Sequence, residues 1–366
     1  MQFKHTNEDA YFVASNSGEG FFSDYHACFD HARIGRVFAV KGGPGTGKSR
    51  FLREVAQKGE EVGYHCEYIY CSSDPDSLDG IILSKGKDCL ALMDATAPHV
   101  YEPSLVGVRE SLIDLGAFWD AELLRRRKEE ILRCSQEKKE AYARAYRYLA
   151  GVGEMMRVKE ALAAPYIKRD GISRLAALLA RELPCGTGFS SSPALIHSIG
   201  MKGEVVLDSY LRAAKQIFLI EDCKESGSLL LAALVEQAKK KELSLRLAYH
   251  PVCPDRLEAI FVQDCSVAFV IGKEKDWGSD QRPIRMRRFV DVHAMRAIRE
   301  RYCHAERSRK ELLKGALLEL SSVRNAHFAL EEIYMQAMDF PKKEQFTKDF
   351  IDALFVLQNG KNCDII

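Results

Sequence analysis

A glycine-rich stretch near the N-terminus constrains this chain more than any other feature. Residues 37 to 52 read VFAVKGGPGTGKSRFL, an apolar run followed by glycines, a lysine, a serine and a helical pattern. Residues 42 to 49 satisfy G-x-x-x-x-G-K-[ST], the pattern of a phosphate-binding loop. Glycines let the backbone curl with its N–H groups pointing inward, and the following helix adds the positive end of its dipole. The sequence therefore predicts a buried strand, a phosphate-binding loop and a helix, in that order.

The loop pattern assigns expected roles to individual residues. We expect Lys48 to reach the β- and γ-phosphates of a nucleotide and to act in catalysis, and Ser49 to supply a hydroxyl group to Mg²⁺. The residues predicted to contact the nucleotide are Gly42, Gly43, Pro44, Gly45, Thr46, Gly47, Lys48, Ser49 and Arg50. The expected ligands are ATP and Mg²⁺, since the N-K-x-D pattern of guanine-binding proteins does not occur.

A carboxylate for the metal is expected at the end of a buried strand. Residues 89 to 93 form an apolar run that ends in Asp94, which we predict to be a catalytic residue and, with Ser49, a ligand of Mg²⁺. The alternative role for Asp94 is a cap on the following turn. His99 follows the same run and is a candidate for contacting phosphate or moving a proton, with a structural role as the alternative.

Acidic residues also follow the preceding predicted strand. Residues 71 to 79 read CSSDPDSLD, and the carboxyl ends of parallel strands form the edge where ligands bind. Asp74 is the catalytic candidate in this loop, with Asp76 and Asp79 beside it, for orienting a second substrate or acting as a general base. The alternative is a Pro-Asp turn with polar caps.

The second half of the chain repeats the first at an offset of about 180 residues. Residues 217 to 220 (IFLI) match 37 to 40 (VFAV), and HPVCPDRLEAIF from His250 matches CSSDPDSLDGII from Cys71. Apolar strands alternate with helical patterns in both halves, which predicts parallel sheets flanked by helices. The expected fold class is therefore α/β, with tandem duplicated sheets like those of phosphate-loop NTPases.

Each half ends in a strongly helical segment. These helical extensions are predicted at about residues 118 to 181 and 291 to 356, where Glu, Lys, Arg, Ala and Leu prevail. The Gly-, Ser- and Pro-rich residues 183 to 193 form the clearest linker. We therefore predict an active domain at residues 1 to 185 and a degenerate copy at residues 186 to 366.

The second copy lacks the residues that bind phosphate. Aligned on the strand, the replacements are Gly42 by Asp222, Gly45 by Glu225, Lys48 by Ser228 and Ser49 by Leu229, while the counterpart of Asp94 falls near Val270. Negative charge would repel a triphosphate there, and no lysine compensates for it. We expect this half to serve as a scaffold, a lid or a regulator rather than as a nucleotide site.

Composition limits the expected cellular location of the protein and the classes of partner that it binds. Eleven cysteines without any C-x-x-C pair favour reduced thiols over disulfides or a zinc cluster. The chain lacks both a signal-peptide pattern and an apolar stretch long enough to span a bilayer, so we expect a cytoplasmic protein with no membrane partner. The net charge of +1 and the absence of known motifs give no indication of nucleic acid. A protein partner of unknown identity is expected, with the helical extensions as candidate binding arms; the alternative is that these extensions simply cover the sheets and pack against each other.

Three stretches together resemble a known family. VFAVKGGPGTGKSRFL, CSSDPDSLDG and MDATAPHVYEP are similar to segments of a family of uncharacterised bacterial ATPases with tandem P-loop-like halves, and the resemblance covers most of the chain. It implies a P-loop fold and ATP binding. The family usually carries a P-loop in both halves and a glycine after the strand-terminal Asp, whereas this chain has a degenerate second loop and Ala95.

Three functions follow as hypotheses. The first is Mg²⁺-dependent ATP hydrolysis that couples nucleotide state to a protein partner. The second is a small-molecule or nucleotide kinase, in which acidic residues orient an acceptor hydroxyl group. The third is a sensor that binds ATP without turnover.

Overall fold

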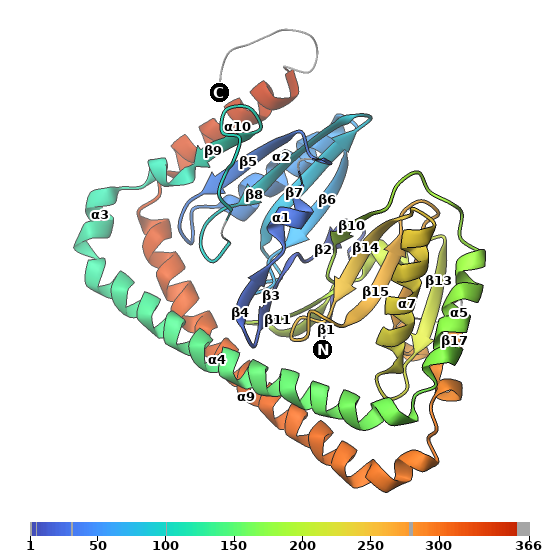
Figure 1. The fold of residues 1–366 in the computed structure, drawn as a ribbon. Coiled ribbons are helices and arrows are strands. Elements are labelled where there is room, and N and C mark those ends of the chain that lie inside the picture. The colour runs from blue at the N-terminus through green and yellow to red at the C-terminus, as the bar shows by residue number, and fades with distance from the viewer. Residues whose placement is uncertain (1, 5, 31, 100, 278–280, 357–366) are drawn as a thin grey trace.

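The computed structural model describes residues 2–4, 6–30, 32–99, 101–277 and 281–356. Figure 1 shows two sheets, each belonging mainly to one half of the chain, and two long helices that run along one side of both. The protein is therefore an α/β protein with two similar halves.

The first sheet has six strands in a mixed arrangement. Their order is β2 (Asp9–Tyr11), β6 (His65–Tyr70), β7 (Leu78–Lys85), β8 (Asp88–Asp94), β5 (Arg36–Lys41) and β9 (Glu110–Asp114). β5 is parallel to both of its neighbours, whereas β7 is antiparallel to β6 and β8. This arrangement places the end of β5, where the glycine-rich loop begins, between the ends of β8 and β9.

The second sheet repeats this order strand for strand. It contains β10 (Ser190–Pro193), β14 (Ser244–Tyr249), β15 (Leu257–Val262), β16 (Val267–Ile271), β13 (Gln216–Glu221) and β17 (Arg282–Arg285). Parallel and antiparallel pairs fall at the same places in both sheets, and β6 and β14 share a register shift, beside Tyr70 and Tyr249. The duplication predicted from the sequence is confirmed.

The expectation of parallel sheets was wrong, because each sheet contains an antiparallel strand that the sequence analysis missed. β7 follows the Pro-Asp loop and forms a hairpin with β8 around Gly86, whose φ is 61°. β15 and β16 form the equivalent hairpin in the second half. A short turn with glycine between two apolar runs is a hairpin signal, so the sequence did contain this information.

Helices cover the outer faces of the sheets, and the inner faces share a core. In the first half α2 (Lys48–Glu61) packs its apolar residues, such as Phe51 and Val55, against the sheet. In the second half α7 (Ser226–Lys240) does the same. A central cluster combines residues from both sheets, including Met93 and Leu219. Strands buried on both faces read as continuous apolar runs, which explains why they were recognisable in the sequence.

The helical extension of each half covers the sheet of the other half. α4 (Lys128–Ala163) crosses to the second half, where α5 (Arg169–Arg181) packs against α7. α9 (Arg299–Gln336) crosses back, and α10 (Phe340–Val356) packs on α2. The domain boundary at residues 185/186 remains a prediction. In the structure each half contributes its last helix to the other half, since α5 packs on α7 and α10 packs on α2.

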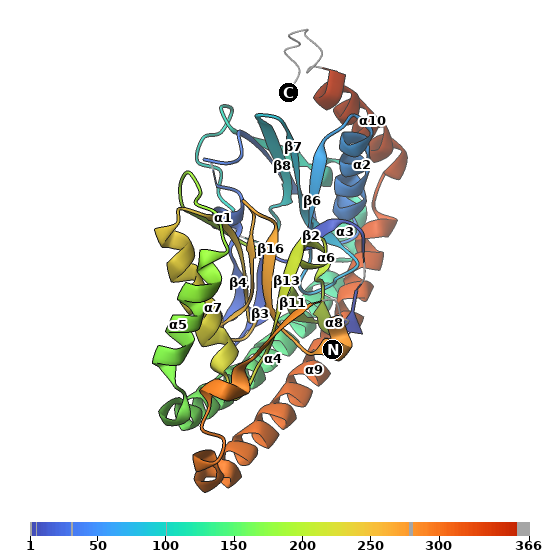
Figure 2. The same cartoon turned by 90° about the vertical axis from the view of Figure 1, so that its right-hand side faces the viewer.

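The long helices α4 and α9 lie antiparallel and side by side, as Figures 1 and 2 both show. Arg144 of α4 pairs with Glu319 of α9 at 2.9 Å, and Leu149 and Leu320 are buried between them and the sheet bodies. The pair spans both halves, so a single rigid element contacts both glycine-loop regions.

Short elements complete the fold. They are β1 (Gln2–Phe3), β3 (Ala14–Ser17), β4 (Gly20–Ser23), α1 (Tyr25–Cys28), η1 (Leu115–Phe118), α3 (Ala121–Arg126), η2 (Ala164–Tyr166), β11 (His197–Gly200), β12 (Gly203–Val206), α6 (Ser209–Arg212), α8 (Glu274–Trp277), η3 (Met286–Phe289) and η4 (Ala294–Ile298). Within the described ranges, none of the helices has the length and apolar character that crossing a bilayer requires.

Candidate functional site

The first glycine loop connects β5 to α2 in a conformation that depends on glycine. Gly42, Gly45 and Gly47 have φ values of 151°, 73° and 79°, a region that other residues rarely adopt. Gly47 is the N-cap of α2, so the helix begins directly at the end of the loop. Among the described residues, nothing accepts a hydrogen bond from the backbone N–H groups of Gly43, Gly45, Thr46 or Gly47. The loop therefore presents unpaired donors at a helix N-terminus, the arrangement that suits an anion.

Lys48 lies among the groups predicted to act with it. Its Nζ donates to the carbonyl oxygens of Gly42 and Gly43, at 2.7 and 2.9 Å, and lies 3.5 Å from Oδ2 of Asp94. Asp94 ends β8 next to β5, and its Oδ1 accepts from the N–H of Thr96 at 2.8 Å. The structure thus brings Lys48 and Asp94 together from positions far apart in the sequence.

Ser49 is held at the start of β7. Its Oγ accepts a hydrogen bond from the N–H of Leu78 at 2.9 Å, which leaves the hydroxyl proton and a second lone pair for another partner. Ser49, Lys48 and Asp94 fit the chemistry of a magnesium and triphosphate site, because they provide hard oxygen atoms and a cation beside unpaired backbone donors.

Residues from both long helices border this loop. A Cβ atom at Gly45 would lie 2.6 Å from the carbonyl oxygen of Glu331 on α9, so helix packing also requires glycine there. Burial lowers the pKa of Lys138 on α4, and the charge of Lys48 adds to this effect. Burial, together with Lys138 and Lys48, lowers the pKa of His327 on α9 to about 4. No sequence pattern singled out these helix residues, because only the fold brings them to the loop.

His99 and Asp79 form a buried pair beside this site. Nε2 of His99 lies 3.2 Å from Oδ2 of Asp79, and the two residues are 6% and 4% exposed. Burial raises the pKa of Asp79 to about 6, which His99 opposes and Asp94 reinforces. The sequence analysis gave the catalytic role in this loop to Asp74, but the residue that lies with His99 is Asp79.

Asp74 and Arg50 are engaged elsewhere. Asp74 lies 2.7 Å from Nζ of Lys202, which comes from the turn between β11 and β12. Arg50 is exposed and pairs with Glu54 on its own helix and, at 3.5 Å, with Glu344 on α10. The structure does not bring either side chain into contact with Lys48.

The second glycine loop has the same frame, but its own side chain occupies the backbone donors. Oδ1 of Asp222 accepts from the N–H of Gly227 at 2.6 Å, and Oδ2 accepts from the N–H of Glu225 at 3.1 Å. Burial raises the pKa of Asp222. A carboxylate thus lies where an anion would meet the loop.

The hydrogen bonds correct the predicted alignment of the two loops. Oγ of Ser228 accepts from the N–H of Leu257 at 3.2 Å, the same bond that links Ser49 to Leu78. Ser228 is therefore the counterpart of Ser49, whereas we had matched it with Lys48. The second loop is one residue shorter, and Gly227 stands opposite Lys48.

The counterpart of Asp94 also moves by one position. Val40 pairs with Asp94 in the first sheet, and the matching residue Ile220 pairs with Ile271 in the second. The apolar residue in place of the metal ligand is thus Ile271, not Val270. The conclusion that this carboxylate has no counterpart is unchanged.

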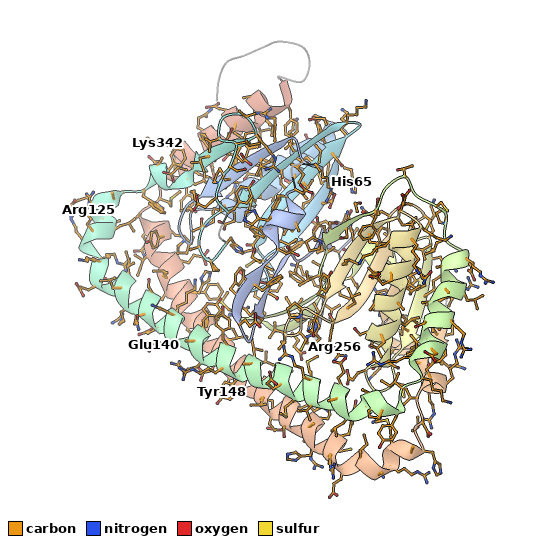
Figure 3. All side chains as sticks on the ribbon, in the orientation of Figure 1. His65, Arg125, Glu140, Tyr148, Arg256 and Lys342 are labelled. Atoms are coloured by element: carbon orange, nitrogen blue, oxygen red, sulfur yellow. The ribbon has the colours of Figure 1, made fainter. Side chains whose placement is uncertain are left out.

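Basic residues neutralise the acidic charge of the second loop. Glu225 pairs with Lys159 of α4 at 2.8 Å, with Arg256, and with the hydroxyl group of Tyr302 on α9 at 3.1 Å. Burial alone would raise the pKa of Glu225, but Arg256 and Lys159 lower it to about 2. Figure 3 shows Arg256 at the end of the second sheet that faces α4. The repulsion expected from this charge is therefore largely compensated within the protein.

The fold and the two loops define an α/β protein with one glycine loop whose backbone donors are unpaired among the described residues and one whose donors bind its own carboxylate. Comparison of the chain with protein-family models, with curated proteins and with solved structures found no match in any of the three. The resemblance to tandem P-loop ATPases therefore stays a prediction.

Proposed function

We propose that the chain has a P-loop fold and binds ATP with Mg²⁺ at the first glycine loop, where it hydrolyses the nucleotide. The observation that carries this proposal is the contrast between the loops: the donors of the first are unpaired, whereas those of the second are occupied by Asp222. The same backbone frame therefore suits an anion in one half and binds an internal carboxylate in the other.

The residues of the first loop would act together on the phosphates. Lys48 would exchange the carbonyl oxygens of Gly42 and Gly43 for phosphate oxygens, a small movement of a flexible side chain. Ser49 and Asp94 would hold Mg²⁺, which neutralises phosphate charge when bound.

The long helices support a coupling role. α9 contacts the first loop through Glu331, and Tyr302 of the same helix contacts the second loop through Glu225. Both helices also expose apolar side chains, such as Leu132 on α4 and Leu318 on α9, which are 52% and 72% exposed. A protein partner that recognises this helix pair belongs to the proposal.

The test is phosphate release from MgATP by the wild type and by Lys48→Ala. We expect the substitution to reduce release by about 100-fold or more, because it removes the cation that contacts the transferred group. Lys58→Ala is the matched control, since Lys58 is an exposed lysine of the same helix that pairs with Glu61. Release that persists in Lys48→Ala would place the activity elsewhere.

If the wild type releases no phosphate, its melting temperature with MgATP distinguishes the remaining hypotheses. A rise in melting temperature with MgATP that Lys48→Ala abolishes would then favour a kinase awaiting its acceptor, or a sensor. No rise in melting temperature and no release would contradict nucleotide binding altogether.

A further inference from the structure

Three residues of metal-binding types meet beside the first glycine loop. Cys71 follows β6, Asp79 lies at the start of β7 and His99 follows β8, so three neighbouring strands bring them together. Their ligand atoms all lie within 4.8 Å of one another. No zinc-binding pattern was recognisable in the sequence, because these residues are widely and irregularly spaced along the chain.

The spacing within this cluster suits a shared cation. Nε2 of His99 and Oδ2 of Asp79 are 3.2 Å apart, yet Oδ2 of Asp79 and Nδ1 of His99 have no hydrogen-bond partner among the described residues. Two ligands of a tetrahedral zinc ion, each at about 2.0–2.1 Å, lie about 3.3 Å apart. The separation therefore fits two ligands of one metal better than a well-formed hydrogen bond.

The surroundings hold each ligand in place. The His99 ring stacks on Tyr25, with centroids 5.0 Å apart, and Phe21 contacts it edge-on at the same distance. Sγ of Cys71 accepts from the N–H of Asp74 at 3.5 Å, which helps to position the sulfur atom. His99 and Asp79 are also more than nine-tenths buried, so the ligand set is fixed before any ion arrives.

We propose that Cys71, Asp79 and His99 bind a thiophilic divalent transition metal of the zinc class, with a fourth position left to water. A thiolate and an imidazole select such an ion over Mg²⁺, which prefers oxygen ligands. The ligand set shares no residue with Ser49 and Asp94, and the inference does not depend on nucleotide binding.

The second half provides an internal comparison. His250 and Glu258 occupy the positions of Cys71 and Asp79, and His197 joins them, with ligand atoms equally close. Nδ1 of His250, however, accepts from the N–H groups of Val252 and Cys253 at 3.1 and 3.3 Å. The proton of neutral His250 therefore resides on Nε2, which does not suit a metal ligand. The hydrogen bonds favour the first cluster as the metal site.

The test is titration of the untagged full chain with Co²⁺ after removal of bound metal by a chelator. We expect one Co²⁺ per chain, with visible bands of tetrahedral cobalt and a sulfur-to-cobalt charge-transfer band. Cys71→Ser should abolish the charge-transfer band, and His99→Gln should reduce affinity by about 10-fold or more. Cys265→Ser is the matched control, since Cys265 is another half-buried cysteine, and should leave both signals unchanged.

A second measurement keeps the result clear if a variant misfolds. Co²⁺ should protect Cys71 of the wild type from alkylation, read by mass spectrometry, while leaving the alkylation of Cys265 unchanged. A charge-transfer band that survives in Cys71→Ser would overturn the proposal. So would metal binding that is lost in His250→Gln but retained in Cys71→Ser, or no binding by the folded wild type. MgATP turnover is measured separately, so failure of the metal site leaves the proposed function standing.

Discussion

The first and second glycine loops share the middle of their turn and differ in length and in what meets their backbone donors. Gly45 and Glu225 have φ values of 73° and 69°, and the hydroxyl groups of Thr46 and Ser226 each donate to the carbonyl oxygen three residues earlier, at 2.9 and 2.7 Å. The turn is thus a property of the fold. Asp222 replaces Gly42, and its carboxylate accepts from the N–H of Glu225, the counterpart of the unpaired N–H of Gly45, and from the N–H of Gly227. The comparison teaches that the same connection of strand, loop and helix forms whether the backbone donors are left unpaired or bind an internal carboxylate.

The long helices contact the two loops in different ways. In the first half the backbone carbonyl of Glu331 on α9 lies against Gly45, whereas in the second half the charged side chain of Lys159 on α4 pairs with Glu225. The acidic charge of the second loop is therefore paired within the chain.

The largest expected effect comes from giving the first loop the carboxylate of the second. In Gly42→Asp, the new carboxylate should take the backbone donors, as Asp222 does, and should pair with Lys48. We expect MgATP turnover to fall by about 100-fold or more, since an internal anion competes with the phosphates. Phosphate release and nucleotide-induced stabilisation are the measurements.

Strain has to be separated from charge in this experiment. Gly42 has a φ of 151°, and a Cβ atom there would lie 2.8 Å from Oγ1 of Thr46, so any side chain strains the loop. Gly42→Ala is the matched control, because it adds the Cβ atom without the carboxylate. Equal turnover in the two variants would show that strain, and not the carboxylate, decides the difference between the loops.

Sequence predicted the local elements of this fold well. The strand, loop and helix around Lys48 and their repeat in the second half were recognisable, because buried strands read as apolar runs and glycine patterns mark the turn. The position of Asp94 at the end of a strand was predicted because this residue ends such a run. The hairpin strand β7 was missed, since its apolar residues follow a polar loop directly and were assigned to that loop.

The sequence did not predict which distant elements contact one another. The exchange of α5 and α10 between the halves depends on where α4 and α9 lead, and helical periodicity does not encode that direction. The contact of Glu331 with the first loop and the meeting of Cys71 with His99 follow from this arrangement and from strand order. The one-residue error at Ser228 arose because the shortening of the second loop is visible only in matched hydrogen bonds.

A smaller effect should follow from removing the base that neutralises the second loop. Lys159 bridges Glu225 and Glu306 at 2.8 and 2.7 Å and is 11% exposed. In Lys159→Met we expect unfolding free energy to fall by about 2–3 kcal/mol, less than for a wholly unpaired buried charge because Arg256 still contacts Glu225. Urea denaturation measures this loss.

MgATP turnover is the second measurement on Lys159→Met. If the second loop is purely structural, Lys159→Met should hydrolyse MgATP at the wild-type rate under conditions where it is folded. Lys314→Met, at an exposed lysine of α9, is the control and should change neither quantity. A fall in turnover without a fall in stability would mean that the second loop regulates the first.

The smallest expected effect concerns the histidine cluster of the second half. Burial alone would lower the pKa of His197, but Glu258 and Glu204, at 3.5 and 3.6 Å, raise it to about 9, while the neighbouring His250 has a pKa lowered to about 4 by burial. Because the folded pKa of His197 exceeds its unfolded value, its contribution to stability is complete below about pH 6.5 and is lost as the pH rises through 9. Between pH 7 and 9 the unfolding free energy of the wild type should fall by up to about 2 kcal/mol as His197 loses its proton.

His197→Gln should be less stable than the wild type at pH 7, and its unfolding free energy should not fall in this way between pH 7 and 9. Urea denaturation across this pH range measures both effects. An unchanged slope in the variant would mean that His197 is not held in its charged form by Glu258 and Glu204.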